Sequence, residues 1–197
     1  MAVASSMELD LMPPRFSEGL YDWSPGNGLP DDGCYAERGG ARIAQGDPEF
    51  GSCLELRKSE KIQRLRYMGE MPYREGSYLR VYTRIRPVSG SGFDARIGAW
   101  PGGMGAVRVD GLRESGPVVA VDDDEVVEVS AVIGPEKLPG VDMVWDGRVM
   151  FGHVGVDFIG DGGSVLRVED LSVTDVTEEI TGELRTMPGF TAMDYSR

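Results

Sequence analysis

Apolar and polar residues alternate most regularly in the middle of the chain. In residues 78–86 the odd-numbered positions are apolar or β-branched, whereas the even-numbered positions carry tyrosine or arginine. In residues 93–100 the odd-numbered positions are again apolar. A period of two is typical of a strand that buries one face. The link between the two segments, residues 87–92, is rich in Ser and Gly and predicts an antiparallel hairpin.

Shorter apolar segments predict further strands along the chain. They lie at residues 16–23, 41–44, 53–57, 61–68, 126–133, 141–145, 150–158 and 165–176. A helical pattern is found at residues 177–185. Many short strands separated by turns favour an all-β fold, and we predict a jelly-roll β-sandwich over residues 16–177. A short N-terminal arm (residues 1–15) and a short C-terminal tail (residues 178–197) flank it, and the arm is either a loose terminus or an anchor for a partner.

The last predicted strand contains a change of phase. Leu166 and Val168 lie in one phase, whereas Leu171 and Val173 lie in the other. A β-bulge at residues 169–170 reconciles the two pairs. Such a bulge turns a carboxylate toward the interior, where the charge needs a partner or a metal ion such as Ca²⁺.

The composition agrees with a β-rich chain and argues against two classes of protein. Of 197 residues, 28 are glycine and 12 are proline, which supplies turns and leaves little room for long helices. No apolar run approaches the roughly 18 residues of a membrane helix, so we expect no membrane insertion. The formal net charge of −13 repels phosphate backbones and argues against nucleic acid as a partner.

The cysteines and the N-terminus indicate the cellular compartment in which the chain is made. Cys34 and Cys53 are too few for a disulfide scaffold and lack zinc-binding spacing. They could pair across neighbouring strands, but free thiols are the better expectation in a reducing compartment. The N-terminus from Met1 to Glu8 has neither the basic nor the apolar segment of a secretory signal. We therefore expect synthesis in the cytoplasm and release by lysis or as part of a particle.

The polar face of the predicted hairpin is the most informative candidate site. Aromatic rings stack on the apolar faces of sugars, and Arg and Asp bind hydroxyls or acidic sugars. The face is therefore a candidate carbohydrate-binding surface, and the alternative is that it packs against another subunit or a covering loop. Its residues are Tyr78, Arg80, Tyr82, Arg84, Asp94, Arg96 and Trp100.

Catalytic signatures are sparse. The one histidine, His153, has no nucleophile motif beside it, and a surface or strand-partnered histidine is the simpler interpretation. A glycosidase pair of carboxylates stays open, because 33 acidic residues offer many pairs without singling one out. We predict no enzyme and no catalytic residue.

Three segments resemble the galactose-binding-like sandwich of carbohydrate-binding modules. They lie at residues 16–23, 76–81 and 166–173. The resemblance implies a structural Ca²⁺ site formed by an acid of the opening segment and an Asp of the closing strand. The matching residues here are Glu18 and Asp170, although Ser17 separates Phe16 from Glu18, which departs from the family's adjacent pair.

Other segments resemble a domain of alphaproteobacterial phage-like proteins, found on head spike or fibre proteins of gene transfer agents. They lie at residues 51–60, 63–70, 109–112 and 141–145. This resemblance implies a non-enzymatic spike component that is mounted on the capsid and helps bind the recipient's capsular polysaccharide. The implied partners are a capsid vertex protein, other spike subunits and copies of the chain itself, expected as a pentamer.

Two other functions remain open. The chain could be a purely structural spike base or adaptor, in which case the aromatic residues of the hairpin would lie in an interface. It could also be a polysaccharide-degrading enzyme or the accessory domain of one.

Overall fold

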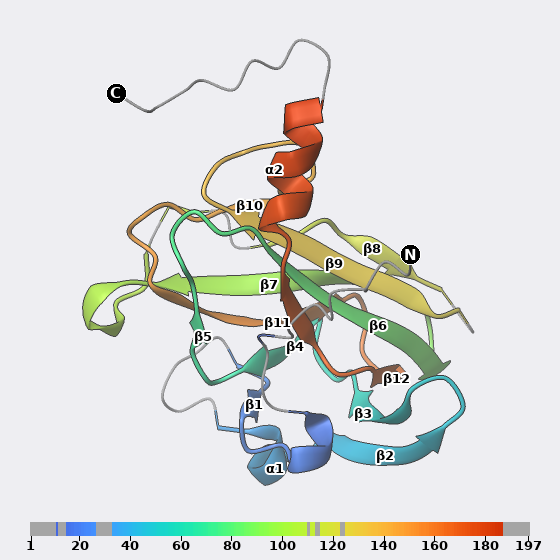
Figure 1. Ribbon diagram of the computed structural model, residues 1–197. Coiled ribbons are helices and arrows are strands. Elements are labelled where there is room, and N and C mark those ends of the chain that lie inside the picture. Colours follow the sequence, from blue (N-terminus) through green and yellow to red (C-terminus); the bar gives the residue numbers. More distant parts are fainter. Residues whose placement is uncertain are drawn as a thin grey trace, which may run out of the picture.

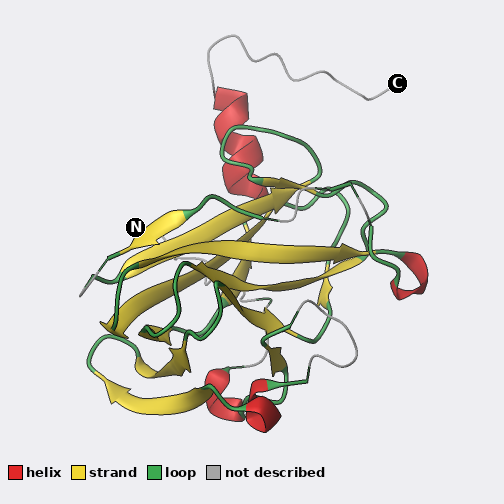
Figure 2. Cartoon of the chain, turned by 180° about the vertical axis from the view of Figure 1, so that it is seen from behind, coloured by secondary structure: helices red, strands yellow, loops and turns green. Residues whose placement is uncertain are grey.

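The structure is a computed structural model that describes residues 11, 15–26, 33–109, 111–112, 115–122 and 125–186. In this part of the chain two β-sheets pack face to face (Figures 1 and 2). The predicted all-β sandwich is confirmed. The N-terminal arm, apart from Leu11 and Arg15, and the tail beyond residue 186 lie outside the described residues.

The first sheet, here called sheet A, has six strands. In order they are β1 (Trp23–Ser24), β4 (Ile62–Tyr67), β11 (Phe151–Ile159), β7 (Phe93–Gly102) and β8 (Val119–Val121), with β5 (Met71–Pro72) also pairing with β11.

The second sheet, here called sheet B, has seven strands. In order they are β10 (Met143–Val144), β9 (Val127–Gly134), β6 (Leu79–Ser89), β12 (Val165–Val168), β3 (Gly51–Arg57) and β2 (Ala41–Asp47), with β13 (Ser172–Asp175) also pairing with β6. Four helical segments complete the described chain: η1 (Phe16–Glu18), α1 (Tyr35–Arg38), η3 (Met104–Ala106) and α2 (Thr177–Thr186).

The core lies between the two sheets and explains the alternation in the sequence. On β6 the apolar side chains Leu79, Val81 and Ile85 point inward and are at most 2% exposed. On β7 the same holds for Ala95 and Ile97, both fully buried. Removing this apolar surface from water is the main stabilising contribution to the sandwich.

The predicted hairpin of β6 and β7 is wrong. The two strands belong to different sheets, because β6 pairs with β9, β12 and β13, whereas β7 pairs with β8 and β11. Their link therefore crosses from one sheet to the other. At Gly90 the link passes so close to the backbone of Ser164 that a Cβ would lie 2.6 Å from its Cα. The alternation of apolar and polar residues predicts which side chains of a strand are buried, but it does not predict which other strand pairs with it.

The first predicted strand is also largely wrong. Residues 16–18 form a 3-10 turn, and only Trp23 and Ser24 are in a strand. Gly19 ends the turn with φ of 122°, a backbone conformation that favours glycine. The aromatic residues expected on a strand still reach the core, because the ring centroids of Phe16 and Trp23 are 4.7 Å apart.

The predicted bulge and helix are confirmed. Strands β12 and β13 are separated by residues 169–171, and Leu166, Val168, Leu171 and Val173 are nevertheless all buried. Helix α2 begins where the helical pattern begins and stands at one end of the sandwich (Figure 1).

The structure also bears on the predictions about the cysteines and about membrane helices. Cys34 and Cys53 are free thiols, and both are buried. Within the described residues there is no helix both long and apolar enough to span a membrane.

Lys58 is fully buried between the sheets' connecting turns, where its Nζ donates to the carbonyls of Glu60, Lys61 and Gly160.

Candidate functional site

The structure does not bring the seven predicted binding residues together. Because β6 and β7 lie in opposite sheets, their polar faces point to opposite sides of the sandwich. Tyr78 precedes β6 and is buried, 3% exposed, in a cluster with Val176 and with Ile180 of α2. Each of the other six falls on one outer face or the other. Asp94, Arg96 and Trp100 are on sheet A, and Arg80, Tyr82 and Arg84 are on sheet B.

A row of three charged side chains crosses the centre of sheet A. The register places Arg64 of β4, Asp157 of β11 and Arg96 of β7 side by side. Arg64 Nε donates to Asp157 Oδ1 at 3.0 Å, and Arg96 Nε and Nη2 donate to Oδ2 at 3.1 and 3.0 Å. The Asp157 side chain is 3% exposed, whereas those of Arg64 and Arg96 are 21% and 28% exposed. The buried carboxylate thus fixes two partly exposed guanidiniums.

Trp100 lies beside this row, beneath two guanidiniums. The Cζ atoms of Arg64 and Arg66 lie 5.8 and 5.3 Å from its ring centroid, over the ring. The ring also extends over Gly98, where a Cβ would lie 3.0 Å from indole Cη2. Cation–π contact orients both guanidiniums. We call Arg64, Arg66, Arg96, Trp100 and Asp157 the sheet A face.

His153 borders the sheet A face and is held by a backbone carbonyl. It is paired with Trp100 in the register, and its Nδ1 lies 2.9 Å from the carbonyl oxygen of Gly69. Burial, together with the charge of Arg66, lowers the pKa of His153. The ring is therefore uncharged at neutral pH. A strand-partnered histidine was the simpler interpretation of the sequence, and the geometry agrees with it.

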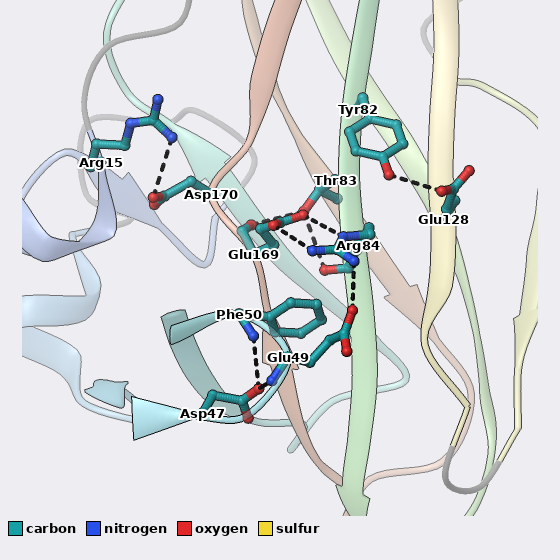
Figure 3. A network of polar contacts seen from close by, with 10 residues as sticks. All are labelled: Arg15, Asp47, Glu49, Phe50, Tyr82, Thr83, Arg84, Glu128, Glu169 and Asp170. Atoms are coloured by element: carbon teal, nitrogen blue, oxygen red, sulfur yellow. Dashed lines mark hydrogen bonds and ion pairs between the residues drawn. The ribbon is translucent and has the colours of Figure 1, made fainter. Parts of the chain in front are cut away.

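The outer face of sheet B also carries charges that pair within the chain. Arg84 donates to both carboxylate oxygens of Glu169 at 2.8 Å and to Glu49 at 2.7 Å (Figure 3). The Arg84 Cζ also lies 5.2 Å from the ring centroid of Phe50. Tyr82 donates its hydroxyl to Glu128 at 3.1 Å. This face is a network of mutually positioned side chains.

A second cluster on sheet B surrounds Asp47. Its carboxylate accepts hydrogen bonds from Arg86 and Arg167 and from the backbone N–H groups of Glu49 and Phe50. Burial alone would raise the pKa of Asp47, but these hydrogen bonds, that from Arg167 foremost, hold it far below the usual value. The cluster locks the turn between β2 and β3 against the sheet.

The two residues of the expected calcium site lie at the same end of the molecule. Asp170 Oδ1 accepts the Phe16 N–H at 2.7 Å, and Oδ2 lies 3.6 Å from Arg15 Nη1. Glu18 is exposed on η1. Nowhere in the part of the chain that is described do three or more His, Cys, Asp or Glu side chains gather closely enough to hold a metal ion. The bulge carboxylate has an N–H and a guanidinium as partners.

Sequence reasoning missed three residues of the sheet A face: Arg64, Arg66 and Asp157. A signal for the first two was present, because Gln63 and Leu65 point inward on β4 and leave Arg64 and Arg66 in the opposite phase. Asp157 is different, since its role depends on which strands flank β11.

Comparisons with known proteins identify the fold. No protein-family model matches the chain, and neither does any curated protein sequence. Among solved structures, the CBM22-1 xylan-binding domain of Paenibacillus barcinonensis Xyn10C matches 88% of this chain and 98% of its own, with a TM-score of 0.55 and 11% identity. The fold is that of a carbohydrate-binding module.

Two structures from Clostridium thermocellum Xyn10B have the same fold. Its C-terminal family 22 module matches 82% of this chain and 89% of its own, with a TM-score of 0.52 and 8% identity. The CBM22-1–GH10 modules, complexed with xylohexaose, match 85% of this chain and 29% of their own length, with a TM-score of 0.53 and 11% identity. The galactose-binding-like sandwich implied by the sequence is therefore confirmed as the fold, while the low identities leave the ligand to be argued from this chain's own residues.

Proposed function

We propose that this chain binds an acidic polysaccharide, without cleaving it, through the sheet A face. The row Arg64–Asp157–Arg96 carries the proposal. Both oxygens of Asp157 are engaged by guanidiniums, so this carboxylate positions the arginines rather than acting on a substrate. A guanidinium presents a planar fork of donors that matches a carboxylate or a sulfate group. Acidic sugars carry these groups.

Preorganisation supports the proposal. A free arginine side chain loses rotamer entropy when it binds, which weakens binding by about 0.5–1.5 kcal/mol for each side chain ordered. Here Asp157 orders the guanidiniums of Arg64 and Arg96 before any ligand binds. The Trp100 ring orders those of Arg64 and Arg66. In the row itself two partly exposed guanidiniums meet one carboxylate, so the row has a net positive charge on a chain whose net charge is −13. Acidic glycans would be repelled elsewhere and attracted here.

We further propose that the chain works as a spike component of a phage-like gene transfer particle, mounted on the capsid and binding the recipient's capsular polysaccharide. The resemblance of residues 51–60 and 63–70 supports this part. Several copies on one particle, expected as a pentamer, would combine weak single sites into firm attachment. The chain would then be made in the cytoplasm and reach the cell exterior with the particle on lysis.

Burial of Tyr78 reduces the number of aromatic residues that the structural-adaptor alternative can place in an interface. Its side chain packs within the chain against Val176 and Ile180, so it is not available to an interface. Trp100 is also buried, 9% exposed, beneath the guanidiniums of Arg64 and Arg66, so the adaptor alternative rests mainly on Tyr82. In that case alanine variants at these positions would abolish assembly and leave glycan binding unchanged.

The polysaccharide proposal is tested by calorimetric titration of the full chain with polygalacturonate, a uronic acid polymer. Arg96→Gln removes one fork and leaves the Arg64–Asp157 pair in place. We expect the affinity to fall by about tenfold, the loss of one charge-assisted contact. The matched control is Arg80→Gln on sheet B, which also removes a partly exposed, ion-paired arginine.

Two results would contradict the proposal. One is no binding of polygalacturonate by the wild-type chain at low ionic strength. The other is equal affinity of the wild type and Arg96→Gln, with thermal unfolding showing both to be folded. Release of reducing ends during the titration would favour the enzyme alternative.

A further inference from the structure

We infer that the outer face of sheet B carries a second, separate sugar site, one for a neutral sugar unit. The site is a hollow of about 370 Å³ above β6 and β13. Its position is set by the break between β12 and β13, which brings two consecutive carboxylates to the surface. Bulges commonly redirect side chains next to binding sites. The hollow is lined by Arg15, Phe50, Ser52, Tyr82, Glu169, Asp170 and Ser172.

Two aromatic rings border the hollow, and both are held in place. The Tyr82 hydroxyl is bonded to Glu128, and the Phe50 ring is in contact with the Arg84 guanidinium (Figure 3). Fixed rings offer apolar area to the C–H faces of a pyranose without a large loss of side-chain entropy. Because the rings come from a strand and a tight turn of sheet B, the sandwich itself sets their separation.

The polar groups of the hollow suit hydroxyls. Each Glu169 oxygen accepts one hydrogen bond from Arg84, and Asp170 Oδ1 accepts one from Phe16. A carboxylate oxygen has a second lone pair, so these groups can still accept from sugar hydroxyls. Ser52 and Ser172 add hydroxyls that both donate and accept. A few placed polar groups beside apolar rings are typical of small-ligand sites, and the volume is at the small end of the range for them.

The charge of the hollow selects neutral sugars. Glu169 and Asp170 line it together with one guanidinium, that of Arg15, while Glu128 bonds to Tyr82 and Glu49 pairs with Arg84. An acidic sugar would meet more carboxylates than guanidiniums. This balance is the reverse of that on the sheet A face. The two sites therefore differ in ligand charge and lie on opposite sides of the sandwich, which would let one chain contact an acidic backbone and a neutral unit.

The test is a titration of the full chain with three neutral probes, xylohexaose, cellohexaose and maltohexaose. We expect at least one to bind the wild type, and Tyr82→Ala to weaken that probe by about tenfold through loss of the stacking ring. Tyr21→Ala is the matched control, because Tyr21 is 72% exposed and does not line the hollow. We expect it to bind as the wild type does, and thermal unfolding verifies that both variants are folded.

The outcomes separate this site from the sheet A face. Loss of the neutral probe in Tyr82→Ala but not in Arg96→Gln supports the inference. It is overturned if no neutral probe binds the wild type, if Tyr82→Ala binds as the wild type does, or if Arg96→Gln alone abolishes the neutral probe. Binding of polygalacturonate by Tyr82→Ala tests the sheet A face independently. Each of the two proposals can therefore fail without affecting the test of the other.

Discussion

Asp157 shows how one buried residue organises a surface. It lies below the surface of sheet A, and both of its oxygens are engaged by arginines from the neighbouring strands. Its role was invisible in the sequence, because Gly155 and His153 in the same phase gave no sign of a charged row. The strand itself was predictable at residues 150–158, but the two neighbours of β11 come from positions about 60 and 90 residues earlier. Local patterns do not contain such partners.

Removing the Asp157 carboxylate should destabilise the fold strongly. Asp157→Ala leaves two partly buried guanidiniums without their acceptor, and breaking a buried ion pair typically costs about 3–5 kcal/mol. Because Arg64 and Arg96 are partly exposed, we expect about 2–3 kcal/mol in urea unfolding after allowing for solvent screening. The control is Asp146→Ala, whose pair with Arg148 is exposed, and we expect a far smaller loss. Equal losses for the two variants would contradict the role assigned to Asp157.

Asp47 should make stability depend on acid pH. Because its pKa is lower in the folded chain than the usual value near 4, its stabilising contribution is complete above about pH 4 and is lost as the pH falls toward the folded-state pKa. In urea unfolding at pH 7, 5, 4 and 3, the wild type should therefore lose more stability below pH 4 than Asp47→Asn. The same pH slope in both proteins would show that Asp47 contributes nothing to acid sensitivity.

At the scale of elements, strands were easier to predict than their neighbours. The predicted strands at residues 126–133 and 150–158 are shifted by one residue from β9 and β11, and β6 extends three residues beyond the predicted end at 86. The bulge between β12 and β13 was also visible, since it shifts that phase. The β6–β7 hairpin failed because a turn-rich link serves equally for a hairpin and for a crossing between sheets. The face proposed from it was consequently split in two.

The buried ammonium of Lys58 connects elements that are far apart in the sequence. It donates to carbonyls of the turn before β4 and of the turn after β11. Lys58→Met keeps much of the side-chain volume but removes the ammonium donor from the carbonyls of Glu60 and Gly160, at a cost of about 1–3 kcal/mol for each buried unsatisfied group, whereas the Lys61 carbonyl keeps the Gly160 N–H. We expect a loss of about 3 kcal/mol or more in urea unfolding. Arg57→Met, at the exposed neighbouring position, is the control, and similar stability of both variants would contradict the account.

At the scale of the whole molecule, a row with a net positive charge lies on one sheet of an acidic protein. The net charge of −13 excluded nucleic acid when only the sequence was considered. With the fold in place, the same charge limits where an acidic glycan could dock, namely on the sheet A face. The composition could not show this, because it counts charges without placing them on opposite sheets.

Salt should therefore weaken the two proposed sites unequally. Screening shortens the range of electrostatic attraction from about 30 Å at 0.01 M to about 8 Å at 0.15 M ionic strength. We expect polygalacturonate affinity to fall steeply across this range and the affinity of a neutral hexasaccharide to change little. The comparison is made by calorimetry in the same buffer series. A salt-independent affinity for polygalacturonate would mean that the arginines do not carry its binding.

The most direct measurement is a structure of the full chain with an oligogalacturonate bound. We expect sugar carboxylates against the guanidiniums of Arg64 and Arg96, with Asp157 still holding both arginines from below. Oligogalacturonate seated in the hollow of sheet B, or away from both faces, would contradict it.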